Sequence, residues 1–167
     1  MQMKNLKTLI VKTSFFSKPQ VHLPNSLYRV LEWHSYSLHD IPSDFLPKNL
    51  SICKLPNSGF LLFKFPNSLK ERVMISSSSF CIEKHYLLSM KVLRLDRSKC
   101  LTEISDVSGL QNLEEFSFER CKNLLRIHES VGFLNKLKIL NAEERMRSII
   151  SFVNKGMMLQ SNNAFIR

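Results

Sequence analysis

The stretch LEEFSFERCKNLLRIHESVGFLNKLKIL, residues 113–140, decides the fold. Its first six residues alternate like those of a β-strand, and its second half places apolar residues every three or four positions. The stretch is either a strand and a helix of an ordinary domain or one coil of a repeating structure. Only a repeating structure predicts further copies of the same pattern along the chain.

The pattern L-x-x-L-x-L-x-x-C, which covers Leu113, Phe116, Phe118 and Cys121, recurs along the chain. Copies begin at residues 6, 28, 50, 70, 90, 113 and 137, and the copy at 70 is weaker than the others. Proline-containing segments stand before three of these starts, at 23–27, 46–50 and 65–69. Proline cannot donate a ladder hydrogen bond, so each segment marks the return of the chain into the next strand. A short, steady period of this kind is typical of a solenoid.

We therefore predict an α/β leucine-rich-repeat solenoid, a horseshoe arc of about seven coils with parallel strands on its concave side. The repeat domain is predicted at 1–144, and the non-repeat tail at 145–167 is predicted to be a short helix or disordered. Spaced apolar residues after the later strands predict short helical or 3₁₀ segments on the convex side. Eight residues after each start a small side chain is expected to turn inward, so Tyr36 predicts a distorted second coil.

Composition places the chain among globular proteins, with 44% hydrophobic and 23% charged residues. No apolar run approaches the roughly 18 residues that span a bilayer. The N-terminus is interrupted by Lys4, Lys7 and Lys12 and lacks the apolar core of a signal peptide. We expect a protein of the cytoplasm or nucleus that does not bind membranes. The net charge is +10, but its Lys and Arg residues are scattered, which makes nucleic acid a distant alternative partner.

The sequence offers little for catalysis or metal binding. The four cysteines contain no C-x-x-C pair and the five histidines no H-x-x-x-H pair, so a metal site is not expected. A hydrolase or transferase that uses Cys121 with a histidine remains an alternative, although the repeat assigns Cys121 to turn packing. Trp33 is expected in the core. We predict a chain that is not an enzyme, with no catalytic, cofactor-binding or metal-binding residue.

The face that would bind a partner is predicted from the strands, because side chains that flank the inward leucines point outward. Its charges change from basic in the early coils to acidic in the later ones, a pattern suited to a polar protein surface. A merely solvated strand face is the alternative. The candidate residues are Lys12, Glu32, His34, Lys54, Arg72, Arg94, Asp96, Glu115, Ser117, Glu119 and Asn141.

Residues 3–141 resemble the start of the leucine-rich-repeat region of plant disease-resistance proteins that carry TIR and nucleotide-binding domains. The resemblance lies in MKNLKTLIVK, LPNSLYRVLEW, IPSDFLPKNLSICKLPNS and above all LTEISDVSGLQNLEEFSFERCKNLLRIHESVGFLNKLKILNAE. No G-x-x-x-x-G-K-[ST] motif occurs, so the ADP/ATP site of the family's nucleotide-binding domain is absent from this chain, and no cofactor is implied.

The resemblance implies a protein-interaction module in defence signalling. Its partner would be a pathogen effector or, in the resting receptor, the receptor's own nucleotide-binding domain. A truncated, stand-alone adaptor or decoy that regulates a full-length receptor is the alternative. The transcript distinguishes the two, because a receptor transcript joins this segment to an upstream nucleotide-binding motif.

Overall fold

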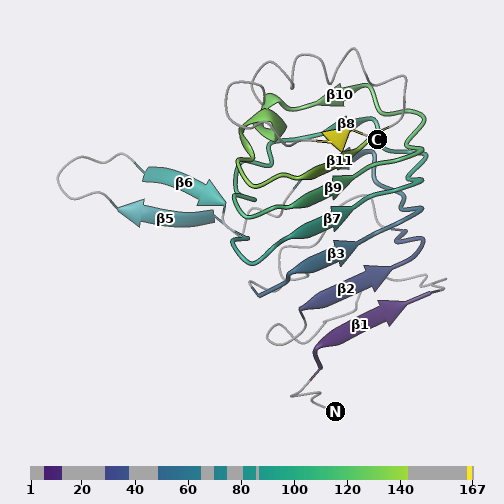
Figure 1. Cartoon of the computed structure of the whole chain (residues 1–167), viewed down its shortest axis with the longest axis horizontal. Coiled ribbons are helices and arrows are strands. Elements are labelled where there is room, and N and C mark those ends of the chain that lie inside the picture. The colour runs from purple at the N-terminus through teal and green to yellow at the C-terminus, as the bar shows by residue number, and fades with distance from the viewer. Residues whose placement is uncertain are drawn as a thin grey trace.

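The main sheet joins strands that lie far apart in the sequence (Figure 1). The computed structural model describes residues 6–12, 29–37, 49–64, 70–74, 81–85, 87–142 and 165–166, and for 70–74, 81–85 and 165–166 it describes the backbone alone. In order across the sheet, the strands are β1 (Thr8–Val11), β2 (Val30–Trp33), β3 (Ile52–Lys54), β7 (Val92–Arg94), β9 (Glu115–Ser117), β11 (Ile139–Asn141) and β12 (Phe165–Ile166). All neighbours pair in parallel, so the chain forms a parallel-strand β-solenoid.

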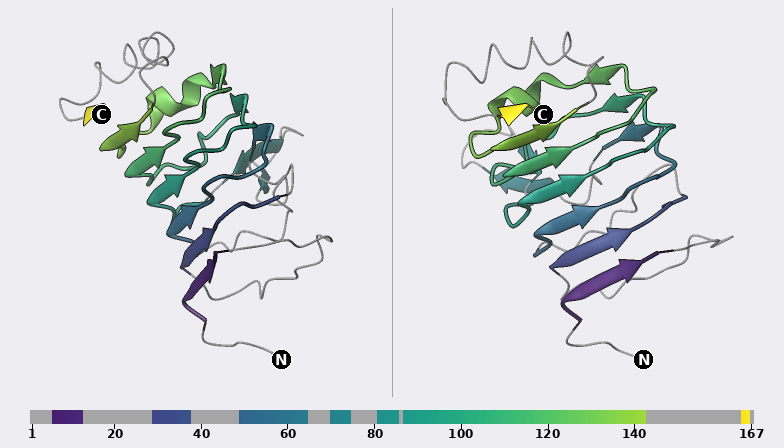
Figure 2. Two further views of the ribbon diagram at one scale, coloured as in Figure 1. Left: turned by 90° about the vertical axis from the view of Figure 1, so that its right-hand side faces the viewer. Right: turned by 45° about the vertical axis from the view of Figure 1, so that its right-hand side comes forward.

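The register of this sheet follows the sequence repeat. Six strands, β1, β2, β3, β7, β9 and β11, each begin two residues after a repeat start. Leu31 lies opposite Leu9 and Cys53, and Leu93 lies opposite Cys53 and Phe116. Equivalent positions of the repeat therefore stack in rows across the sheet, as the two views of Figure 2 show for the strands.

A second, three-stranded parallel sheet forms the other side of the coils. It consists of β4 (Leu62–Phe63), β8 (Glu103–Ile104) and β10 (Arg126–Ile127), and β8 and β10 lie in segments that the sequence predicted as helical or 3₁₀. That prediction is wrong for β8 and β10, because their backbone groups pair between coils, as Ser105 N does with Phe63 O at 2.9 Å. It is confirmed for the residues after β10, where Glu129–Phe133 form a five-residue 3₁₀ helix. The described part of the chain contains no α-helix, so the α/β class is not supported.

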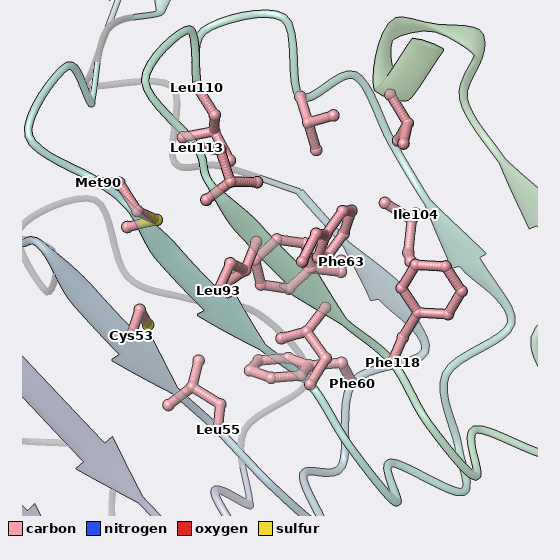
Figure 3. Close-up of a cluster of buried hydrophobic side chains, with 14 of the residues drawn as sticks. Cys53, Leu55, Phe60, Phe63, Met90, Leu93, Ile104, Leu110, Leu113 and Phe118 are labelled. Atoms are coloured by element: carbon pink, nitrogen blue, oxygen red, sulfur yellow. The ribbon is translucent and has the colours of Figure 1, made fainter. Parts of the chain in front are cut away.

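The core lies between the two sheets (Figure 3). Leu93 and Phe116 of the main sheet are fully buried, and Phe63 and Ile104 close the same cluster from the second sheet. Trp33 is 5% exposed, which confirms its predicted core position. Burying a large apolar side chain contributes about 1.5–3 kcal/mol, so the stacked rows are the main source of stability.

The four coils whose turns the structure describes leave the main sheet in the same way. The seventh residue after the repeat start has a left-handed backbone in four coils, at Ser35, Asn57, Arg97 and Arg120 (φ 56–60°). The eighth residue, at Tyr36, Ser58, Ser98 and Cys121, turns inward and is buried. The predicted distortion at Tyr36 is therefore wrong, because its ring packs between Trp33 and Phe60, with centroids 5.5 and 5.3 Å away.

The predicted coil at residue 70 is also wrong. Residues Lys70–Met74 form β5, which pairs antiparallel with β6 (Cys81–His85), while β3 pairs directly with β7. Figure 1 shows this hairpin projecting from the side of the solenoid. The apolar spacing around Val73 fits a strand of either kind. Pairing with the following segment Cys81–His85 closes only a short loop, which costs little conformational entropy and favours the hairpin. Arg72, a predicted interface residue, therefore lies on the hairpin opposite Glu83 and not in the main sheet.

Part of the predicted tail joins the solenoid. Phe165 and Ile166 form β12, which pairs in parallel with Ile139 and Leu140 of β11. The prediction of a helical or disordered tail is wrong for these two residues, because β11 leaves an edge of unpaired backbone groups that a strand can complete. Residues 143–164 and 167 lie outside the described residues, as do most of the proline-containing segments.

Removing the hairpin tests its placement outside the main sheet. Replacing residues 65–86 by a flexible Gly/Ser linker should leave the thermal unfolding midpoint within about 5 °C of the parent, because β3 already pairs with β7. Circular dichroism melting measures this midpoint. A matched deletion of residues 92–114, one complete coil with its strand, should lower the midpoint further. Equal losses in the two variants would contradict the assignment.

Ser98 tests the turn between coils. Its side chain is fully buried, and its Oγ accepts a hydrogen bond from Ser58 N at 3.1 Å. Ser98→Ala leaves that amide without its acceptor and should cost about 1–3 kcal/mol of unfolding free energy, measured by urea denaturation. Ser37→Ala, at an exposed position, is the control and should change stability by less than about 0.5 kcal/mol. Equal unfolding midpoints for the two variants would contradict the role of Ser98.

Candidate functional site

The side chains of the main sheet that point away from the core form its outer face, which corresponds to the predicted concave surface. The strand register arranges them in two rows that run across the strands. The first row contains Thr8, Val30, Ile52, Val92, Glu115 and Ile139. The second row contains Ile10, Glu32, Lys54, Arg94, Ser117 and Asn141.

Most of the predicted interface residues lie on or beside this face. Six of them, Glu32, Lys54, Arg94, Glu115, Ser117 and Asn141, are in the two rows. Ser117 is only 2% exposed, so it is not available to a partner as predicted. Another four, Lys12, His34, Asp96 and Glu119, follow the carboxyl ends of β1, β2, β7 and β9. Arg72 alone is placed elsewhere, on the hairpin. The structure therefore places on one face of the sheet predicted residues that are more than 100 positions apart in the sequence.

The charges of the outer face pair with one another across neighbouring strands. Glu32 contacts His34 at 2.7 Å and Lys54 at 3.6 Å, and Arg94 contacts Glu115 at 2.6 Å. The predicted change from basic to acidic charge along the face is therefore offset by these ion pairs between oppositely charged neighbours. Exposed ion pairs contribute about 0–1 kcal/mol each, so a partner can replace them at small cost.

The hydrogen bond from His34 is the main reason that the pKa of Glu32 is lowered from its ordinary value of 4.5. Partial burial opposes this shift, and the nearby Lys54 ammonium supports it. Glu32 therefore remains ionised at neutral pH and holds His34 and Lys54 at the centre of the outer face.

The sequence interpretation missed an apolar component of this face. Val30, Ile52 and Val92 lie side by side and are half-buried, while Ile10 and Ile139 are 51% and 40% exposed. These residues occupy outward positions of the repeat, but the predicted interface contains only charged and polar residues. Exposed aliphatic side chains beside paired charges are suited to contact with another protein.

The carboxyl ends of the strands surround a small pocket of about 200 Å³. Its walls are formed by His34, Pro56, Asn57, Asp96, Arg97 and Glu119. Oδ1 of Asp96 accepts hydrogen bonds from Ser117 Oγ at 2.5 Å and from Glu119 N at 2.9 Å. Glu119 in turn pairs with Arg120 at 3.3 Å.

Two of the left-handed turn residues are arginines, Arg97 and Arg120. A left-handed backbone costs roughly 1–2 kcal/mol for a residue with a Cβ, and asparagine and glycine tolerate it best. The equivalent residue of the preceding coil is Asn57, which suits the conformation. The turn therefore does not require arginine at either position.

The cysteine and histidine candidates have structural roles. The Cys121 side chain is 3% exposed and its thiol donates to Leu95 O at 3.2 Å, which confirms the predicted turn packing. Burial raises the pKa of Cys53 to about 12, so its thiol stays protonated. His128 Nδ1 accepts from Ser130 N at the start of the 3₁₀ helix. Among the described residues no group of three or more His, Cys, Asp and Glu side chains is placed to hold a metal ion.

Comparison with known proteins identifies relatives but no solved counterpart. Disease resistance-like protein DSC1 of Arabidopsis thaliana is 32% identical over 115 residues, which are 69% of this chain and 8% of that protein. Disease resistance protein RPP2A of the same plant is 30% identical over 134 residues, 79% of this chain and 9% of that protein. Disease resistance protein RRS1 is 27% identical over 150 residues, 83% and 10% respectively.

The chain is a distant relative of plant disease-resistance proteins. It spans only 8–10% of the length of these three disease-resistance proteins. No protein-family model and no solved structure matches it. In the part of the chain that the structure describes, no helix is long and apolar enough to cross a membrane.

The lowered pKa of Glu32 predicts how stability depends on pH. Ionised Glu32 stabilises the fold above its unfolded pKa near 4.5, and this contribution is lost as pH falls through the lower folded pKa. Glu32→Gln should therefore cost up to about 1 kcal/mol at pH 7 and little at pH 3, in urea unfolding measured at both values. The control is Glu129→Gln, at an exposed position. A cost that grows toward acid pH would contradict the prediction.

Proposed function

We propose that this chain is a non-enzymatic, protein-binding leucine-rich-repeat segment of a plant disease-resistance receptor. The supporting observation is the outer face of the main sheet, where the apolar row of Val30, Ile52 and Val92 lies beside the ion pairs Glu32–Lys54 and Arg94–Glu115. The relation to disease-resistance proteins supports the biological setting, defence signalling in the cytoplasm or nucleus.

The arrangement of the face suits a protein partner. Val30, Ile52 and Val92 supply aliphatic contact area, while the pairs Glu32–Lys54 and Arg94–Glu115 supply charges that a polar surface can exchange. By resemblance to the family, the partner is a pathogen effector or the nucleotide-binding domain of the receptor. The family's ADP/ATP site is not part of this chain, so we propose no cofactor.

The second candidate is an adaptor or decoy that acts without the rest of a receptor. The same outer face supports it, because a protein-binding surface serves either role. The transcript distinguishes the two candidates. An upstream nucleotide-binding motif in the same reading frame supports the receptor segment, and its absence from every transcript supports the adaptor.

Interaction with a nucleotide-binding domain tests the proposal. In a pull-down of the recombinant nucleotide-binding domain of the parent receptor, Val92→Glu should reduce binding by at least about tenfold, because a charge replaces the centre of the apolar row. Leu125→Glu is the matched control, since Leu125 is 68% exposed beside the second sheet. It should leave binding unchanged.

The effector alternative is tested by the same pair of variants with the matching effector as bait. Equal binding of Val92→Glu and the parent to both baits would contradict the outer face as the docking surface. Equal losses in the two variants would indicate a general effect of charge and would contradict it as well. Urea unfolding of both variants establishes that they are folded.

A further inference from the structure

The turns after β7 and β9 carry a cluster of basic residues beside the pocket. Arg97 and Arg120 occupy the seventh position of their coils, and Lys99 and Lys122 the ninth. All four are exposed, and Arg97 N donates to Glu119 O at 2.8 Å, which holds the two turns in adjacent coils. The other two coils with this turn carry Ser35 and Asn57 at the seventh position. The cluster is therefore confined to one end of the outer face, next to the pocket.

The charges around the pocket are not equally compensated. The carboxylate of Asp96 receives two hydrogen bonds, and that of Glu119 is paired with Arg120. Arg97 has no side-chain hydrogen bond or ion pair with any residue that the structure describes, although it lines the pocket. Its guanidinium is thus the charge in the pocket wall that is available to a ligand.

The backbone conformation of Arg97 does not require an arginine side chain. Its backbone is left-handed (φ 60°), a conformation that Asn57 satisfies in the preceding coil with less strain. Asn57 lines the same pocket, so its amide can donate beside the guanidinium.

We propose that this pocket binds an acidic side chain, Asp or Glu, of a protein partner. Arg97 would hold the carboxylate through two parallel N–H···O hydrogen bonds, a geometry that a guanidinium favours. Asn57 donates a further hydrogen bond, and the Pro56 ring contacts the methylene groups of the bound side chain. This assignment rests on the proposed function, since it places one specific contact at the end of the outer face.

Two features indicate that the ligand is a single side chain of a protein. The volume of about 200 Å³ is below the usual range of small-molecule sites, roughly 300–1,000 Å³, and suits one side chain. The carboxylates of Asp96 and Glu119 also lie in the wall and repel any anion that does not contact Arg97 directly, so the pocket holds one carboxylate at most and not a row of phosphates. A protein partner can place one carboxylate at Arg97 and apolar groups on the row of Val30, Ile52 and Val92.

Peptide binding to the full chain tests the pocket. The probe is a fluorescein-labelled peptide of alternating glutamate and serine, compared with the same peptide containing glutamine, and fluorescence anisotropy measures the dissociation constants. The parent should bind the glutamate peptide at least about tenfold more tightly than the glutamine peptide, because a charged hydrogen-bond pair is lost. Arg97→Asn should abolish this preference, while Arg97→Lys should retain part of it.

The matched control is Arg126→Asn, which removes the same charge from the second sheet, where Arg126 is 79% exposed and pairs with Glu103. It should change the preference by less than about twofold, because Arg126 does not line the pocket. Asn tolerates a left-handed backbone, so urea unfolding of Arg97→Asn should show a midpoint equal to or above that of the parent.

Three outcomes would overturn the proposal. They are equal losses in Arg97→Asn and Arg126→Asn, no preference for the glutamate peptide in the parent, and tighter binding of a single-stranded RNA oligonucleotide that also depends on Arg97. None of them alters the comparison of Val92→Glu with Leu125→Glu. Failure of the pocket is thus distinguishable from failure of the outer face as a docking surface.

Discussion

Parallel pairing of equivalent repeat positions is the constraint on which the rest of the structure depends. Leu31, Cys53, Leu93 and Phe116 stand opposite one another in successive strands, so each coil buries its inward apolar side chains only against the next coil. A shift of one residue in any strand would turn its inward row to solvent. Stability and register thus have the same origin, and neither belongs to a single coil.

The turn that follows each strand is a consequence of this pairing. To bring the next inward residue under the sheet, the chain must reverse sharply, and the left-handed backbone at Asn57 or Arg97 supplies that reversal. The following residue is then buried and bonded, as Ser58 is to Ser98 and to Leu55 O. Backbone bonds such as Asn57 N to Asp96 O at 2.9 Å join the turns of adjacent coils. The pocket near Arg97 is a surface feature of this ladder of turns.

The sequence predicted those parts of the fold that the repeat determines. The parallel strands and the inward positions of Trp33 and Cys121 follow from spacing alone, because a stacked coil leaves one place for each position. The strand at Lys70–Met74 shows where spacing fails, since its apolar pattern fits the repeat equally well as a solenoid strand and as half of a local hairpin. Spacing also cannot show that β8 and β10 pair between coils, because short apolar segments suit a strand or a helical turn.

The candidate site was predictable in position but not in character. Outward residues are known once the register is known, yet the pairing of Arg94 with Glu115 depends on side-chain reach between coils. Such pairs make the outer face nearly neutral, so in the proposed function its specificity comes from the residues outside these pairs. Arg97 and the apolar row of Val30, Ile52 and Val92 lie outside these ion pairs. Because neither is needed for the register, both can change without loss of the fold, as a recognition surface requires.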